Sequence, residues 1–184
     1  MASFLDSIGY NLWVLPALLA IPLVGALIVL VIPVRQPTES GVETPAARQV
    51  ALWLFVLEFV VSIGLWWSFN PAETGWQAPI DIGWIPTWGV RFTLGVDGIA
   101  LMMVLLTTFI MPLSVLGSWT SIRTKVRSYY ALLLILTTGM LGVFLARDLF
   151  LFYVMWEVML VPMYFIIGVW GGERRIYASL KFFI

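Results

Sequence analysis

The sequence predicts an all-α membrane protein that crosses the bilayer several times. Hydrophobic residues make up 61% of the 184 positions and charged residues 11%, and the mean hydropathy is +1.00. Five runs are apolar for long enough to span a bilayer as helices, which takes about 20 residues each. These proportions are typical of polytopic membrane proteins and exceed what a soluble core of this size requires. We expect one transmembrane domain over residues 1–184.

Charge balance and missing residue types exclude several classes of function. Ten basic and ten acidic residues leave no net charge. Nucleic-acid binding needs a basic face, so we expect no nucleic-acid partner. The sequence contains no cysteine and no histidine, which removes most ways of holding zinc, haem or an iron–sulfur cluster. We therefore expect no cofactor and no metal in this chain, and any redox cofactor would belong to other subunits.

The first two predicted spans are residues 12–32 and 49–69, joined by a polar loop. The first contains two prolines, which membrane helices tolerate. The second carries a carboxylate, Glu58, about 15 Å along the helix from Arg48. A buried membrane carboxylate serves a proton path or partners a polar group elsewhere in the bundle, and both roles stay open for Glu58.

Residues 70–91 form the longest predicted segment outside the membrane. Its tryptophans and those just before it indicate an interfacial aromatic belt. They are Trp66, Trp67, Trp76, Trp84 and Trp88. Residues 90–94 alternate as a short strand would, but the run is too brief to establish one. Asp97 directly precedes the third span, residues 99–117, and is expected to cap its N-terminus.

A basic loop leads from the third span to the fourth, residues 129–146. Arg147 and Asp148 connect the fourth span to the fifth, which belongs to the apolar stretch 147–172. So short a connection predicts two antiparallel neighbours. A further apolar run, residues 176–184, reaches about 14 Å, less than half a bilayer, and is expected to be the start of a sixth span.

Lysine and arginine are concentrated in one set of loops. That set holds Arg35, Arg48, Arg123, Lys125, Arg127, Arg174 and Arg175. The opposite set holds Arg91 and Arg147. By the positive-inside rule, the basic loops face the cytoplasm, and the N-terminus and the tryptophan-rich loop lie outside.

Glu157 lies near the middle of the fifth span. Placing an ionisable group there costs on the order of 3 kcal/mol even on the lenient insertion scale, so such a group normally faces a partner or water inside a bundle. Tyr153 and Tyr164 fall on the same helical stripe and flank the carboxylate. Pro162 removes a backbone hydrogen bond about one turn away and loosens the helix there. Glu157 is therefore our first candidate for proton transfer.

The opposite side of the same span carries three methionines at helical spacing. They are Met155, Met159 and Met163. Methionine is flexible and fills irregular gaps between packed elements. We interpret this methionine stripe as packing or lipid contact.

Lys181 is the third charge predicted inside the membrane. It lies about 9 Å from the cytoplasmic end, whereas Glu157 lies about 20 Å from that side, so we expect no direct salt bridge between them. Water or further side chains would have to bridge the gap, as in a proton relay. Lys181 equally fits a lysine that snorkels toward the cytoplasmic interface, and both interpretations stay open.

Several blocks of the chain occur in the order and spacing of one protein family. They are Gly95-Val96-Asp97-Gly98-Ile99-Ala100-Leu101, Trp156-Glu157 with Leu160-Val161-Pro162-Met163-Tyr164, Trp170-Gly171-Gly172, and Tyr177-Ala178-Ser179-Leu180-Lys181-Phe182-Phe183. Together they resemble the N-terminal part of the chain M (subunit 4) family of antiporter-like subunits of respiratory complex I, the proton-pumping NADH:quinone oxidoreductase. The resemblance covers nearly the whole chain, most firmly from Leu94 onward.

This resemblance implies part of an antiporter-like fold, in which about fourteen helices surround two inverted five-helix repeats. In the family, a glutamate of the fifth helix pairs with a lysine of the seventh and takes part in proton translocation. Glu157 matches that glutamate, Lys181 resembles a lysine of the sixth helix, and no family position carries over to Glu58. The seventh-helix lysine lies outside residues 1–184, so we do not expect this chain to pump alone.

The resemblance further implies a subunit that couples remote electron transfer to proton movement. NADH, FMN, iron–sulfur clusters and quinone would be held by partner subunits of the oxidoreductase. Neighbouring antiporter-like subunits and the lipid bilayer would be direct partners, in an energy-transducing membrane that we expect to be a bacterial plasma membrane. Two alternatives stay open: a subunit of a multisubunit Na⁺/H⁺ antiporter, and a truncated remnant that does not pump.

Overall fold

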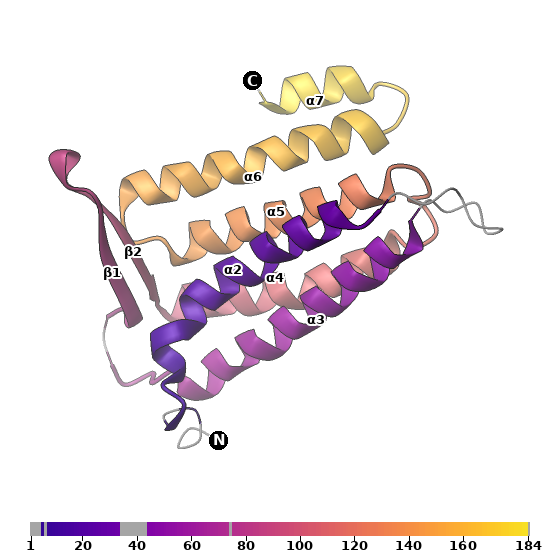
Figure 1. The fold of residues 1–184 in the computed structure, drawn as a ribbon. Coiled ribbons are helices and arrows are strands. Elements are labelled where there is room, and N and C mark those ends of the chain that lie inside the picture. Colours follow the sequence, from indigo (N-terminus) through magenta and orange to yellow (C-terminus); the bar gives the residue numbers. More distant parts are fainter. Residues whose placement is uncertain (1–4, 6, 34–43, 74, 184) are drawn as a thin grey trace.

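The computed structural model consists of a helix bundle with a β-hairpin at one end (Figure 1). It describes residues 5, 7–33, 44–73 and 75–183. The helices are α2 (Tyr10–Val31), α3 (Pro45–Ser68), α4 (Gly98–Gly117), α5 (Val126–Leu145), α6 (Leu149–Trp170) and α7 (Arg175–Phe183). Among the described residues, α2 to α6 are long and apolar enough to cross a membrane, which confirms the five predicted spans.

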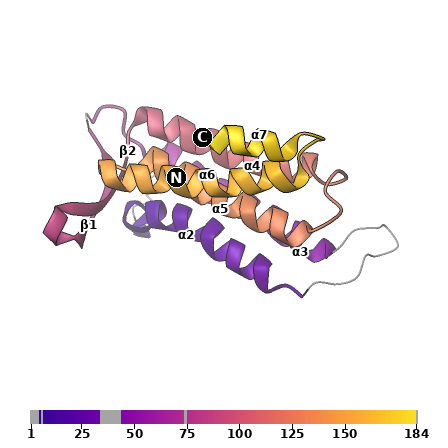
Figure 2. The ribbon, with the colours of Figure 1, turned by 90° about the horizontal axis from the view of Figure 1, so that it is seen from above.

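Helix α5 lies at the centre of the bundle (Figures 1 and 2). It packs against α2, α3, α4 and α6, and it is the most deeply buried of the five candidate spans. Helix α6 packs on α5, β2 and the short helix α7, and of its side chains only Leu151 and Pro162 are buried. One side of α6 is therefore open in the described part of the chain.

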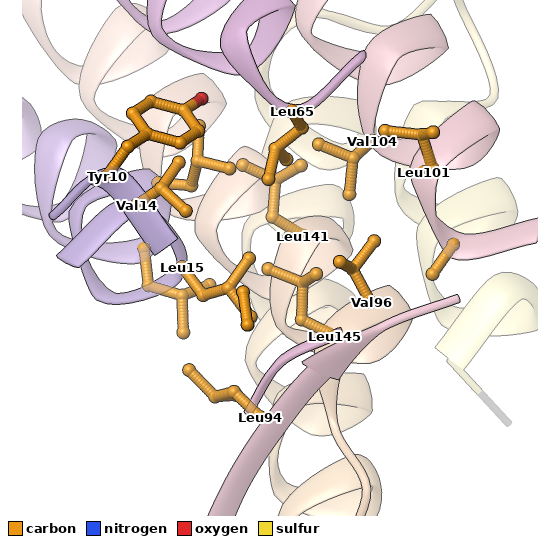
Figure 3. Packing of buried hydrophobic residues seen from close by; sticks show 14 of the residues in the cluster. Tyr10, Val14, Leu15, Leu65, Leu94, Val96, Leu101, Val104, Leu141 and Leu145 are labelled. Atoms are coloured by element: carbon orange, nitrogen blue, oxygen red, sulfur yellow. The ribbon is translucent and has the colours of Figure 1, made fainter. Parts of the chain in front are cut away.

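The buried side chains near the hairpin end form a continuous apolar cluster (Figure 3). Helices α2, α3, α4 and α5 and strand β2 all contribute to it. Its members include Val14, Leu15, Leu65, Leu94, Val96, Leu101, Val104, Leu141 and Leu145. Lipid tails are as apolar as leucine, so in a bilayer such packing stabilises the bundle mainly through van der Waals contact.

Two glycines allow α5 and α6 to approach closely. A Cβ atom added at Gly139 would lie 2.8 Å from the backbone nitrogen of Met159, and one added at Gly142 would lie 2.6 Å from the side chain of Met155. Small residues commonly permit close contact between membrane helices. The packing role of the methionine stripe and the antiparallel pairing of these two helices are both confirmed.

The segment from residue 77 to residue 96 departs from the all-α prediction. Strands β1 (Gln77–Ile85) and β2 (Val90–Val96) form an antiparallel hairpin around a 3₁₀ turn, η1 (Pro86–Trp88). The sequence predicted an extramembrane loop here, and it left residues 90–94 undecided. The fold is thus mostly helical, because strand pairing replaces the loop predicted between the second and third spans.

Contacts with the α5–α6 connection hold β2 in place. The backbone N–H of Arg147 donates to the carbonyl of Thr93 (2.9 Å), and Leu94 pairs with Ala146. Gly95 is needed at this contact because a Cβ there would lie 2.6 Å from the Arg147 side chain. The hairpin is therefore anchored by residues from the other half of the chain.

Carboxylates cap two of the helices. Asp97 accepts a hydrogen bond from the backbone N–H of Ala100 (2.7 Å), which confirms the predicted cap of α4. Asp148 accepts from the backbone N–H groups of Phe150 and Leu151 at the start of α6 (2.9 and 3.1 Å). Each cap satisfies N–H groups that have no partner inside the helix and places negative charge at its N-terminus.

The two predicted sets of basic residues lie at opposite ends of the bundle. Arg48 donates to the carbonyl of Ile122 (3.0 Å) at the end farther from the hairpin, and Arg127 at that end donates to the carbonyl of Ile32 (3.1 Å). Arg35 falls outside the described residues. Which end faces the cytoplasm stays a prediction.

At the hairpin end, both basic residues have partners. Arg91 forms a 2.7 Å ion pair with Asp81, which raises the pKa of the Arg91 guanidinium. Arg147 lies over the Trp76 ring, 5.4 Å from its centroid. Because the Arg91–Asp81 pair is exposed on the hairpin surface, we expect it to contribute little to stability.

Replacing Gly139 by alanine should destabilise the bundle by about 1–3 kcal/mol, because the new methyl group has no room against the α6 backbone. The matched control is Gly117→Ala, where the added Cβ would meet no atom within 4 Å. The free energy of unfolding in lipid or detergent would measure both effects. Equal stability of the two variants would contradict the close α5–α6 contact.

Candidate functional site

Glu157 lies near the middle of α6, on the side away from α5. It is two positions from both Met155 and Met159, which contact α5, so helical geometry places it on the opposite face. The side chain is half-buried. Tyr153, one turn earlier, interacts with the Glu157 carboxylate through its hydroxyl. The structure therefore pairs the carboxylate with one of its two predicted phenolic neighbours.

The other predicted neighbour, Tyr164, packs against α7. Its ring centroid lies 5.7 Å from that of Phe183. Ser179 fixes the same contact, since it is buried and lies close to Gly168 of α6. Helix α7 thus lies beside α6 at Tyr164, about 10 Å along the helix from Glu157.

Lys181 lies on α7 with its side chain exposed in the described structure. Its Nζ atom is 5.9 Å from the centroid of the Tyr177 ring. Lys181 and Glu157, both within the described residues, form no ion pair with each other, as the sequence predicted. Any proton exchange between them requires intervening water or side chains.

Glu58 lies in a different part of the bundle. Its side chain is 0% exposed, and neither carboxyl oxygen has a hydrogen-bond partner in the described part of the chain. Helix α3 packs against α2, α4 and α5, whereas α6 packs on another side of α5 (Figure 1). The three residues selected from the sequence therefore do not form one site.

Sequence reasoning missed a group of buried hydroxyls in the interior of α3, α4 and α5. The group comprises Ser62, Thr107, Thr108, Thr137 and Thr138, each at most 7% exposed. The Ser62 Oγ atom lies 2.7 Å from Thr108 Oγ1, which links α3 to α4. The signal that could have identified the group is the Thr-Thr pair near the middle of two separate spans.

The carboxyl group and the hydroxyls lie at similar depths. Glu58 is ten residues from the last residue of α3, and Thr108 is ten residues from the first residue of α4. The last turn of α3 and the first turn of α4 both lie at the hairpin end of the bundle (Figure 1). Each residue therefore lies about 15 Å from that end of the bundle. Thr137 of α5 lies about 12 Å from the same end by the same measure.

Solved structures with a similar fold define the class of protein. Respiratory complex I from Thermus thermophilus with bound NADH matches with a TM-score of 0.73 and 24% identity, over 91% of this chain and 31% of that chain. The Mrp complex from Dietzia sp. DQ12-45-1b matches with a TM-score of 0.68 and 19% identity, over 91% of this chain and 17% of that chain. The chain has the antiporter-like membrane fold, in part.

Sequence comparisons identify the family within that class. The family model described as "NADH:quinone oxidoreductase/Mrp antiporter, TM" matches residues 146–184. NADH-quinone oxidoreductase subunit M of Rhodobacter capsulatus is 47% identical over 138 residues, which are 75% of this chain and 26% of the relative. Subunit M of Escherichia coli K12 is 39% identical over 181 residues, which cover 92% of this chain and 34% of the relative.

The chain belongs to the subunit M (chain 4) family of NADH-quinone oxidoreductases, as a multi-pass membrane homologue. It spans about a third or less of the length of the curated relatives it matches. The resemblance read from the sequence is thereby confirmed. The segment matched by the family model includes Glu157 and Lys181 and does not reach Glu58.

The hydroxyl contact between α3 and α4 can be tested with a double-mutant cycle. We expect Ser62→Ala and Thr108→Val to show a coupling free energy of about 0.6 kcal/mol, typical of a hydrogen bond between membrane helices. Ser114→Ala combined with Thr108→Val is the control, because the Ser114 hydroxyl bonds to Ile110 of its own helix. Zero coupling between Ser62 and Thr108 would contradict the contact.

Proposed function

We propose that the chain is part of the proton-translocating membrane arm of an NADH:quinone oxidoreductase, in which Glu157 binds and releases a proton during turnover. The observation that carries this proposal is a carboxylate near the middle of α6, on the side left open by α5, within the segment that matches the family model. Ionisable groups at this depth face partners or water and commonly mark ion and proton pathways.

The surroundings of Glu157 suit reversible proton binding. The side chain is half-buried, so the surrounding medium can change with the neighbours that cover α6. The Tyr153 hydroxyl lies beside the carboxylate, one helical turn earlier on α6. Electron transfer in partner subunits, which would hold NADH, FMN, iron–sulfur clusters and quinone, would drive the change in proton affinity through charge rearrangement along the membrane arm.

Lys181 is proposed as the next group in the relay toward the end of the bundle away from the hairpin. Helix α7 is held against α6 by the Tyr164–Phe183 and Gly168–Ser179 contacts, which fix the position of this lysine along α6. Water or side chains between the two groups would carry the proton.

In the intact oxidoreductase, Glu157→Gln should lower NADH-driven proton pumping several-fold while assembly is unchanged, since glutamine keeps the shape but binds no proton. Acidification of inverted vesicles, normalised to NADH oxidation, would measure this. Glu173→Gln, an exposed position between α6 and α7, is the matched control. Wild-type pumping by Glu157→Gln would refute the proposal.

Alanine and arginine substitutions at Lys181 distinguish a proton relay from a lysine that only reaches the interface. If Lys181 relays protons, both Lys181→Ala and Lys181→Arg should reduce pumping several-fold, because arginine stays protonated. If the lysine only snorkels to the interface, arginine should sustain wild-type pumping. Proton flux in the same vesicles distinguishes the two results, and full activity of the arginine variant would remove Lys181 from the relay.

A multisubunit Na⁺/H⁺ antiporter subunit is the second candidate. The matching family model also describes the Mrp antiporter, and the Mrp complex shares the fold. Vesicles containing the intact complex would show sodium-driven pH changes without NADH if this candidate were correct. NADH-driven pumping that does not depend on sodium would support the oxidoreductase.

A further inference from the structure

Glu58 takes no part in the proposed relay, and its surroundings differ from those of Glu157. We propose that Glu58 is a separate proton-binding site, which carries its proton while α3 is packed against α4 and α5. The proposed role of Glu157 does not depend on the packing of α3. The burial, the missing partners and the charges around the Glu58 carboxyl group support this separate site.

The burial of the Glu58 carboxyl group without a hydrogen-bond partner determines which of its two protonation states is favoured. The side chain is 0% exposed, and neither Oε1 nor Oε2 has a hydrogen-bond partner within the described residues. Burying an unpaired carboxylate costs far more than burying an unpaired neutral polar group, because the ion loses its entire hydration. A carboxyl group in this position therefore persists most readily in its neutral, protonated form.

The helices packed around α3 offer no positive charge at the depth of Glu58. Helix α2 contains no lysine or arginine, and neither does α4. On α3 itself, Arg48 lies about 15 Å away along the axis and donates to the carbonyl of Ile122. On α5, Arg127 lies near the same end of the bundle as Arg48, the end farther from the hairpin, and donates to the carbonyl of Ile32.

The remaining titratable groups on these helices are tyrosines, and each is engaged elsewhere. Tyr10 of α2 donates to the carbonyl of Val61. On α5, the hydroxyl of Tyr130 lies 3.1 Å from Ser118, and the ring of Tyr129 packs against Trp170. None of these contacts supplies a cation that would stabilise an ionised Glu58.

Along the face of α3 that carries Glu58, the neighbour on one side of it is apolar and the neighbour on the other side carries a hydroxyl group. Phe55, 0% exposed, lies about one turn away toward the basic loops, and Ser62 lies one turn away toward the hairpin. A hydroxyl has one proton and two lone pairs, so Ser62 keeps acceptor capacity beyond its contact with Thr108. We infer that the Ser62–Thr108 pair is where water first meets the carboxyl group when the interface opens.

Release of the proton is coupled to the packing of α3. The O–H bond of the Glu58 carboxyl breaks, the proton passes to a water molecule, and a carboxylate remains that requires hydration. Hydration at this depth requires α3 to separate from the helices packed on it, because Glu58 and its neighbours on the same face are buried. Proton binding and the packing of α3 therefore stabilise each other.

Infrared difference spectroscopy tests this directly. The full-length protein in lipid nanodiscs at neutral pH should show a carbonyl-stretching band of a protonated carboxylic acid that is absent in Glu58→Gln. The band should shift to lower frequency in D₂O. Glu157→Gln is the matched control, because within the described spans Glu58 and Glu157 are the two carboxyl groups, and it should retain the Glu58 band.

Identical wild-type and Glu58→Gln spectra in the carbonyl-stretching region of protonated carboxylic acids would overturn the proposal, since Glu58 would then be ionised. A band that appears only after sodium is removed would also overturn it, because the site would then bind sodium. If Glu58→Gln fails to accumulate, Glu58→Asp in the Glu157→Gln background replaces it: a shifted acid band supports the proposal, and no acid band refutes it. These readouts require neither NADH oxidation nor pumping, so failure of the Glu157 relay leaves them interpretable.

Discussion

The close contact between α5 and α6 is the constraint on which the arrangement of charged groups depends. No hydrophobic driving force brings helices together in a bilayer, so the contact requires surfaces that fit closely. Gly139 and Gly142 provide one surface, and the methionine stripe of α6 provides the other. Because the methionines must face α5, the rotation of α6 about its axis is fixed. Glu157 then faces the open side of the bundle, where a proton can be exchanged with whatever covers that side.

Helix α5 also separates the two membrane carboxyl groups. Glu157 is half-buried beside a phenolic hydroxyl, whereas Glu58 is fully enclosed without a hydrogen-bond partner among the described residues. The same type of side chain is thereby given two environments with different consequences for its proton. Exposure and a nearby hydrogen-bond donor favour exchange of the carboxyl proton, and enclosure in an apolar setting favours its retention. A sequence that contains both residues in apolar runs of similar length does not reveal this difference.

Features that depend on local pattern were predictable from the sequence. Apolar length located the five spans, and the position of Asp97 identified a helix cap. The hairpin was not predictable, since Pro79 and Gly83 in β1 are typical of loops and β2 is held by Arg147, some fifty residues along the chain. The buried hydroxyls were missed for a related reason. Threonine is compatible with lipid-facing and core positions alike, so only packing places Thr108 against Ser62.

Contacts at two ends and along one side determine the position of Glu157. Asp148 caps the start of α6, and the preceding residue, Arg147, is hydrogen-bonded to β2, which fixes the depth at which the helix begins. The glycine contacts with α5 fix its rotation, and the contact of Tyr164 with α7 fixes its far end. A helix held in this way cannot easily slide to carry a charge across the membrane. In the proposed relay, proton movement at Glu157 would therefore come from changes in water, neighbouring side chains and charge around a carboxylate that stays in place.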